Sequence, residues 1–186
     1  MRRWRVLESQ TLLKNPWFDI KEEKVQISND LAMEGIIVLV FGDWVNVVPL
    51  TENRDLVMVR QYRHGISDFT VETPSGSMED KDGSEENAAR RELLEETGFE
   101  ARRWVYLGKS LTNPGLMNNH IHHFLALDCE KKTEPQPNFS GEELESWVEP
   151  FDEVIRKVRE GQVTHGFTVD GLYRAKDWLD QRTFDR

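Results

Sequence analysis

Three glutamates within one and a half helical turns are the residues of this chain that most directly suggest chemistry. Glu92, Glu95 and Glu96 stand at positions i, i+3 and i+4, and these positions share one face of a helix. Like charges at this spacing repel one another. Hard carboxylate oxygens suit a hard cation such as Mg2+, which proteins bind through one or two carboxylates together with substrate phosphates. The cluster therefore predicts a cation site, and a solvated acidic helix surface is the alternative.

The residues around the cluster predict a helix with defined ends. Ser84 is a good N-cap residue, and the two glutamates that follow it lie in the first turn, where the helix dipole favours anions. Gly98 suits the left-handed conformation that ends many helices. Residues 72–76 are typical of a strand end followed by a loop. We therefore expect strand, loop and helix in this order, with the helix over residues 84–97.

This segment resembles the Nudix box, G-x5-E-x7-R-E-U-x-E-E-x-G-U, in which U is a bulky apolar residue. Residues 91–99 match the second half of the box position by position. The first half departs, because the position of its glutamate falls on Gly83 and the preceding glycine, Gly76, lies one residue too far upstream. An insertion of one residue within 77–82 accounts for the offset but leaves the glutamate missing. Three acidic residues could take its place in space, namely Glu79, Asp82 or Glu85.

Further segments are similar to one branch of that family, the ADP-ribose pyrophosphatases and related hydrolases of nucleoside diphosphate sugars. They are residues 44–50, the strand 56–65 with its Gln-Tyr-Arg motif, and residues 113–115 and 118–126. The resemblance implies a Mg2+-dependent hydrolase, with Mn2+ as the alternative cation. Its substrate would be a nucleotide sugar like ADP-ribose, which it would split into a nucleoside monophosphate and a sugar phosphate.

The same resemblance implies a set of cation ligands. Glu92 and Glu96 would be the main ligands, and Glu95 a further ligand or a group that supports them. The family also uses a backbone carbonyl from the loop before the box, which here falls on Ser75. Arg91 is expected to pair with Glu95, four residues on, or to orient a neighbouring carboxylate.

A catalytic base is expected in a second acidic segment, residues 140–145. ADP-ribose pyrophosphatases carry a mobile catalytic glutamate in the corresponding loop, and Glu142 and Glu143 are the candidates here. Together with Glu95 they are the predicted catalytic carboxylates. Glu142 is preferred because it lies farther from the following strand, and a solvated acidic loop is the alternative.

Two arginines near the Gln-Tyr-Arg motif, Arg60 and Arg63, are candidates for binding substrate, because the guanidinium fork suits phosphate and ribose oxygens. Arg63 lies at the strand end and could turn into the site, whereas a surface position is the alternative for Arg60. His122 and His123 point to opposite faces of one strand, which argues against a zinc site. We expect His122 to be packed or to face substrate.

Aromatic residues near the N-terminus suggest a subunit interface. In the ADP-ribose pyrophosphatase branch the N-terminal strands exchange between subunits, and aromatic side chains there stack on the nucleobase. The resemblance therefore implies a homodimer, with Trp17 as the stacking residue. We divide the chain into residues 1–34, strands that form a dimerisation element, and residues 35–186, the hydrolase domain. Packing of these aromatic residues in a core is the alternative.

Composition limits the partners and the location. The net charge of −10 argues against nucleic acid, whose backbone is bound by lysine and arginine. The single cysteine, Cys129, excludes an internal disulfide and favours a reducing compartment. The sequence has no apolar stretch of the length of a signal peptide or a membrane span. We therefore expect a cytoplasmic protein that binds neither membrane nor nucleic acid.

The hydrophobic pattern predicts an α/β or α+β fold, a mixed β-sheet sandwiched between helices, with antiparallel strands at the N-terminus. Early strands are expected at residues 6–13 and 17–27, and helices near the C-terminus at 153–160 and 169–181.

The dipeptide Gly42-Asp43 predicts a hairpin between strands at residues 35–41 and 44–50. The continuous apolar run at residues 36–41 predicts a strand that is covered on both faces.

Two classes of function stay open. The favoured class is the nucleotide-sugar hydrolase, for which a nucleoside triphosphate or a dinucleoside polyphosphate is the rival substrate. The second class is a Nudix-fold module that senses a nucleotide without cleaving it. The missing first glutamate favours the sensing module, and the intact second half of the box favours the hydrolase.

Overall fold

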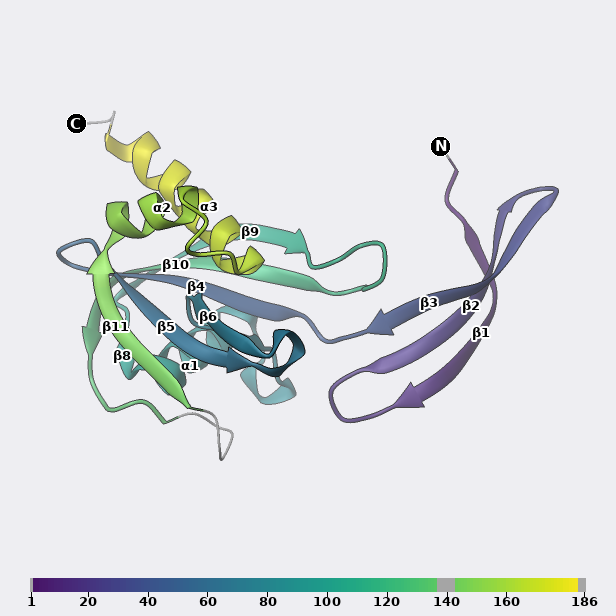
Figure 1. The fold of residues 1–186 in the computed structure, drawn as a ribbon, viewed down its shortest axis with the longest axis horizontal. Helices are drawn as coiled ribbons and strands as arrows, with labels where there is room; N and C mark the ends of the chain where they lie inside the picture. Colours follow the sequence, from purple (N-terminus) through teal and green to yellow (C-terminus); the bar gives the residue numbers. More distant parts are fainter. Residues whose placement is uncertain (1, 137–142, 184–186) are drawn as a thin grey trace. The chain divides into compact units, whose positions relative to one another are not determined.

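The computed structural model describes residues 2–136 and 143–183, and the chain divides into two compact units (Figure 1). One unit contains the chain up to Asp43 together with residues 110–120, and the other contains residues 44–109 and the chain from Ile121 onward. The dimerisation role expected for residues 1–34 stays a prediction.

The N-terminal unit is built on a three-stranded antiparallel sheet. Its strands are β1 (Arg5–Lys14), β2 (Asp19–Ser28) and β3 (Leu31–Val40), in the order β1-β2-β3. The loop at residues 110–120 joins it through the backbone N–H of Leu39, which donates to the carbonyl oxygen of Leu116 at 2.8 Å. The prediction of antiparallel strands at the N-terminus is confirmed.

The prediction of a hairpin at Gly42-Asp43 is wrong. β3 pairs with β2, whereas β4 (Trp44–Thr51) pairs with strands of the other sheet. The dipeptide is held by distant residues instead, because Asn119 Nδ2 donates to the Gly42 carbonyl at 3.1 Å and the His120 N–H donates to Asp43 Oδ1 at 2.8 Å. These bonds hold the dipeptide open, so the chain passes from one sheet to the next and does not reverse.

Residues 36–41 are half-buried, so the prediction of a strand covered on both faces is wrong for the single chain. The described part of the N-terminal unit contains no helix that could cover its sheet. Apolar side chains of β3 therefore keep part of their surface exposed.

The larger unit contains an eight-stranded mixed sheet (Figure 1). Its main path runs in the order β11-β5-β4-β10-β8, with β6 beside β5, β7 beside β4 and β9 beside β10. β4 and β10 are parallel, whereas β8 pairs antiparallel with β10, β11 and β6 pair antiparallel with β5, and β5 and β7 pair antiparallel with β4. The strands are β5 (Asp55–Arg63), β6 (Asp68–Glu72), β7 (Ser75–Ser77), β8 (Phe99–Glu100), β9 (Arg103–Leu111), β10 (His120–Lys131) and β11 (Leu144–Pro150).

Helices cover both faces of this sheet, since neighbouring residues of β4 belong to different cores. Val47 packs in the core beneath α1 (Glu85–Thr97), and Val48 packs in the core formed with α2 (Phe151–Arg159) and α3 (Gly166–Thr183). This alternation places the two cores on opposite faces of the sheet. The predicted fold class, a mixed sheet sandwiched between helices, is confirmed. Two short 3-10 turns, η1 (His64–Ile66) and η2 (Asp80–Asp82), lie in the loops after β5 and before α1.

Among the described residues, the helices are too short or too polar to traverse a lipid bilayer.

Candidate active site

Helix α1 has the ends that the sequence predicts. The Ser84 side chain accepts a hydrogen bond from the N–H of Asn87 at 3.2 Å, and Gly98 adopts a φ of 74°, the left-handed conformation that glycine favours. Ala88 and Leu93 are fully buried against the sheet. The packing of this apolar side fixes the rotation of the helix and therefore the direction of its glutamates.

Two glutamates of α1 lie directly against the loop that precedes the helix. The N–H of Ser75 donates to Glu96 Oε2 at 3.1 Å. A Cβ atom added at Gly76 would lie 2.2 Å from Glu92 Oε1, so a larger residue at this position would displace the carboxylate. The structure thus brings together Glu92, Glu96 and Ser75, three of the residues predicted to hold a cation.

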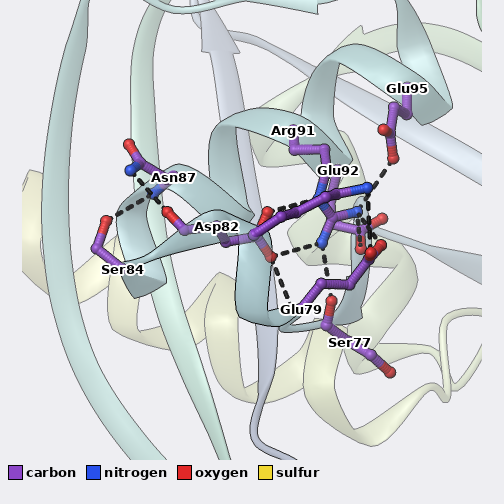
Figure 2. Close-up of polar contacts among 9 residues, drawn as sticks. Ser77, Glu79, Asp82, Ser84, Asn87, Arg91, Glu92 and Glu95 are labelled. Atoms are coloured by element: carbon purple, nitrogen blue, oxygen red, sulfur yellow. Dashed lines mark hydrogen bonds and ion pairs between the residues drawn. The ribbon is translucent and has the colours of Figure 1, made fainter.

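Arg91 is the hub of the acidic cluster (Figure 2). Its guanidinium group donates to both carboxylate oxygens of Asp82, at 2.8 and 2.9 Å, and to the carbonyl oxygen of Ser77 at 2.9 Å. The same group donates to Glu92 Oε1 at 2.8 Å and to Glu95 Oε2 at 3.1 Å. The predicted pairing of Arg91 with Glu95 is confirmed.

Asp82 is the acidic residue that faces Arg91 where the box lacks its first glutamate. It ends the η2 turn, and its Oδ2 accepts a hydrogen bond from the N–H of Glu79 at 2.8 Å. The fork of Arg91 is the main cause that lowers the pKa of Asp82, against the opposing effect of burial. Of the other two candidates, Glu79 reaches Arg91 only at 3.6 Å, and Glu85 lies exposed in the first turn of α1.

The charges around Glu92 favour an additional cation. Burial raises the pKa of Glu92 to about 7; Arg91 opposes this shift, while Glu95 and Asp82 add to it. One arginine is shared among three carboxylates and does not compensate for all of them. Within the described residues no three acidic, histidine or cysteine side chains already form a cage for a metal ion. Mg2+ needs no such cage when substrate phosphates and water complete its shell, so the oxygen donors fit a divalent cation.

A cavity of about 330 Å3 opens beside this cluster. Its wall includes Ser75 and Gly76, the two loop residues that contact Glu96 and Glu92, so the carboxylates lie next to this wall. It is lined by Trp44, Val45, Arg63, Ser75, Gly76, Ser77, Ile121, His165 and Phe167. The predicted substrate residue Arg63 is thus at the cavity, where its Nε donates to Glu72 Oε1 at 2.7 Å.

Glu72 is a fully buried carboxylate held in place by this arginine. Burial acts to raise the pKa of Glu72, but the hydrogen bonds from Arg63, the nearby His165 and the hydroxyl of Thr70 outweigh it, so the net shift is downward. The carboxylate therefore stays ionised and fixes the position of the guanidinium group at the cavity wall.

Arg60 lies at a different place from Arg63. Its guanidinium group stacks over the Phe69 ring at 4.7 Å from the centroid and approaches Glu145 at 3.9 Å. Together with Glu143 it lines a second hollow of about 210 Å3. Glu142, the preferred base, lies outside the described residues.

Trp17 lies between β1 and β2, and 71% of its surface is exposed. The backbone N–H of Trp17 donates to Asn15 Oδ1 at 2.8 Å. Its predicted role in stacking on a base stays a prediction.

Sequence reasoning missed the cavity residues Trp44, His165 and Phe167. Their rings contact one another, with centroids 5.6 Å apart for Trp44 and Phe167 and 5.1 Å apart for His165 and Phe167. The sequence signal for two of them was the tripeptide His165-Gly166-Phe167 at the start of a helix. This tripeptide has no fixed spacing to the Nudix box, so it could not be connected to the site. The predicted candidate His122 is buried, and its Nδ1 lies 3.0 Å from the Tyr106 hydroxyl, so it is a packed residue.

Comparison with known proteins gives a consistent picture. The NUDIX domain family matches residues 41–167. An ADP-ribose pyrophosphatase of Bacillus subtilis is 30% identical over 162 residues, which cover 84% of this chain and 86% of that protein. A methanol dehydrogenase activator of Bacillus methanolicus is 32% identical over 89% of this chain and 88% of its own length. The crystal structure of an ADP compounds hydrolase matches 98% of this chain and 97% of its own with a TM-score of 0.83; at 19% identity, it shows the fold.

Proposed function

Because this chain belongs to the NUDIX domain family of hydrolases, we propose that it cleaves the diphosphate bond of nucleoside diphosphate sugars of the ADP-ribose kind. Water adds to one phosphorus as the bridging phosphorus–oxygen bond breaks, which yields a nucleoside monophosphate and a sugar phosphate. The observation that carries the proposal is the cavity whose wall contains Arg63 and the loop residues that contact Glu92 and Glu96. The similarity to an ADP-ribose pyrophosphatase over most of both chains supports this substrate class.

We assign the cation site to Glu92 and Glu96, with Glu95 as a further ligand and the backbone carbonyl of Ser75 beside them. Mg2+, or Mn2+ in its place, would neutralise the diphosphate oxygens and lower the pKa of bound water. Arg91 holds two of the glutamates in place. Burial, with the nearby Glu95 and Asp82, raises the pKa of Glu92 to about 7, and a bound cation would favour the ionised carboxylate.

We assign the proton-accepting role to the acidic segment before β11, with Glu142 or Glu143 as the base. Glu143 lines the second hollow together with Arg60, so this glutamate is next to a cationic side chain. The double variant Glu142→Gln, Glu143→Gln should lose the acidic limb of the pH–rate profile, and retention of that limb would count against the assignment.

We propose a homodimer formed through the N-terminal strands. Large apolar side chains of this unit are exposed in the single chain, among them Trp4, Val6, Leu12 and Leu31, each at 50% or more. Exposed apolar surface of this extent is typical of an interaction site. A monomeric mass in sedimentation at micromolar concentration would contradict this proposal.

A substrate panel tests the proposed activity. ADP-ribose, other nucleotide sugars, a nucleoside triphosphate and a dinucleoside polyphosphate are incubated with Mg2+ in 18O-labelled water, and products are identified by mass spectrometry. Cleavage of nucleotide sugars is the expected result, and the label shows which phosphorus is attacked. Cleavage of the triphosphate or polyphosphate alone would establish the rival substrate class, and nucleotide binding without cleavage would establish a sensing module.

Variants of α1 test the cation site in the same assay. Glu92→Gln and Glu96→Gln should each lower turnover by orders of magnitude and leave the fold intact. Glu86→Gln is the matched control, because Glu86 lies on the same helix, exposed, and pairs with Arg90 at 2.7 Å. Near-normal turnover in both Glu92→Gln and Glu96→Gln would refute the assignment.

A further inference from the structure

A chain of buried hydrogen bonds runs from helix α3 to the wall of the cavity. At its far end His123 Nε2 lies 3.0 Å from Asp170 Oδ2, and His123 Nδ1 lies 3.3 Å from Asn46 Nδ2. An amide nitrogen can only donate, so His123 Nδ1 accepts and His123 Nε2 carries the proton toward Asp170. Burial lowers the pKa of His123 to about 4, which keeps this ring neutral.

The chain continues through two threonines. The hydroxyl of Thr73 donates its single proton to Asn46 Oδ1 at 2.7 Å. The contact of 3.2 Å between the hydroxyl oxygens of Thr73 and Thr168 therefore needs the proton of Thr168. Thr168 Oγ1 also accepts from the N–H of Thr73 at 3.0 Å, and one lone pair is left.

His165 completes the chain at the cavity, with its Nδ1 3.0 Å from Thr168 Oγ1. Because the Thr168 proton is already committed to Thr73, His165 Nδ1 must be the donor in this contact. The ionised Glu72 favours the same choice, since its Oε2 lies 3.4 Å from Nδ1 and would repel a lone pair there. In a neutral ring the other nitrogen, Nε2, is then an acceptor.

Nε2 of His165 has no hydrogen-bond partner among residues 2–136 and 143–183. Burial lowers the pKa of His165, against the effect of Glu72, so the ring is neutral near pH 7. The cavity therefore presents a fixed acceptor beside the rings of Trp44 and Phe167. A ligand group that contributes a hydrogen-bond donor together with apolar C–H surface complements this wall.

The size and position of the cavity indicate which part of the substrate it would bind. A volume of about 330 Å3 lies at the lower end of the range for small-molecule sites, which is roughly 300–1,000 Å3. Ser75–Ser77 form part of the cavity wall, and Ser75 contacts Glu96, one of the carboxylates assigned to the cation that would hold the diphosphate. In a nucleotide sugar each phosphate is bonded to a sugar, and the base lies one ring farther away. The group next to the diphosphate is therefore a sugar ring.

We propose that this cavity is the subsite for the sugar attached to the cleaved diphosphate, with His165 Nε2 accepting a hydrogen bond from a sugar hydroxyl and Trp44 and Phe167 contacting its C–H face. His165 is then a specificity-determining residue, and its tautomer is set by the series of buried hydrogen bonds that begins at Asp170. The proposal rests on the proposed function in that it takes the substrate to be a nucleotide sugar.

Nitrogen-15 NMR of the histidine rings tests the proposal on the wild-type protein without any turnover. His165 should be protonated at Nδ1 and His123 at Nε2, opposite tautomers at the two ends of one chain. Ribose 5-phosphate with Mg2+ should shift the Nε2 resonance of His165, and the free base adenine should leave it unchanged. A proton on His165 Nε2, or a shift with adenine alone, would overturn the proposal.

Kinetics provide the second test. His165→Phe keeps an aromatic ring but removes the acceptor, and should raise the KM for ADP-ribose about tenfold with kcat nearly unchanged. His120→Phe is the control, because His120 is outside both the cavity and the buried chain and pairs with Asp43. An unchanged KM in His165→Phe would contradict the subsite.

The failure of the subsite and the failure of the proposed function give different results. If no nucleotide sugar is cleaved while ribose 5-phosphate still shifts His165, the proposed activity is wrong and the sugar site stands. If ADP-ribose is cleaved while the sugar phosphate leaves His165 unchanged, the activity stands and the sugar site is wrong.

Discussion

Replacing Gly171 by alanine adds a methyl group where α3 packs against the buried hydrogen-bond chain. The new Cβ would lie 2.3 Å from Asn46 Nδ2 and 3.3 Å from His123 Nδ1. Asn46 is fully buried and is held on both sides, by Thr73 at its oxygen and by His123 at its nitrogen. The amide therefore cannot move aside without breaking one of these bonds.

The magnitude follows from three opposing effects. Alanine is favoured over glycine inside a helix by about 1 kcal/mol. Insertion of a methyl group into a packed core costs about 1–3 kcal/mol, and a buried amide that loses its partner costs about 1–3 kcal/mol. We expect Gly171→Ala to lower the free energy of unfolding by about 3 kcal/mol after the helix gain is subtracted.

Urea denaturation at neutral pH measures this loss, and the same helix supplies the control. A Cβ at Gly166, the first residue of α3, meets open space, so Gly166→Ala should leave stability unchanged or raise it slightly. The two substitutions are chemically identical and should differ in sign. If Gly171→Ala is as stable as the wild type, the buried hydrogen bonds do not fix Asn46. The tautomer assigned to His165, which depends on those hydrogen bonds, would then be wrong.

Two further predictions concern side chains that can carry a charge, His123 and Arg91. The pKa of His123 in the folded chain, about 4, lies below its ordinary value of 6.5. The unfolded chain therefore takes up this proton first, and stability is full above pH 6.5 and falls as the pH drops toward 4. Urea unfolding should show a loss of about 2 kcal/mol from this group between pH 7 and pH 5, and His123→Gln should lack this component; an unchanged slope would contradict it. Arg91→Lys keeps the charge but loses the fork on Asp82, and should lower the free energy of unfolding by about 2 kcal/mol. The neighbouring Arg90→Lys, at a surface pair with Glu86, should change it by no more than about 0.5 kcal/mol, and equal effects of the two substitutions would contradict the role of Arg91 as a hub.

The acidic half of the site could be predicted from sequence because its determinants are local. The cap at Ser84, the stop at Gly98 and the positions of Glu92 and Glu96 all depend on residues within one helix. Helix geometry alone then puts the carboxylates on one face. The fold class followed from similar local patterns, the alternation of strands with helical periodicity.

The failures at residues 36–43 arise from contacts between distant segments. Gly42 and Asp43 have the residue types of a tight turn, but Asn119 and His120 hold them open. A hairpin signal reports only what the local chain can do, and the partner of a strand is decided by the whole sheet. Burial of residues 36–41 likewise depends on what covers the N-terminal sheet and cannot be read from its apolar run.

The second half of the site was missed for a related reason. Trp44 begins β4, and His165 and Phe167 lie at the start of α3, so only the tertiary fold places them in one wall. The hydrogen-bond chain behind them joins β4, β10, α3 and the loop after β6. Each of its residues is an ordinary polar residue in the sequence, and the direction of its protons appears only when all the contacts are considered together.

The departure of the first half of the box from the family pattern has a single structural explanation. Counting forward from Gly76, five residues precede Asp82, which is the spacing the box gives its first glutamate. The extra residue then lies between Asp82 and Arg91, where η2 ends and α1 begins, and not within residues 77–82 as the sequence analysis expected. Gly83 adopts a φ of 69° at this junction, which lets the chain turn from η2 into the helix.

Aspartate is one methylene shorter than glutamate, and the η2 turn brings its carboxylate to both donors of the Arg91 fork. The missing glutamate and the extra residue are therefore one compensated change, and the arginine that orders Glu92 and Glu95 keeps its acidic partner.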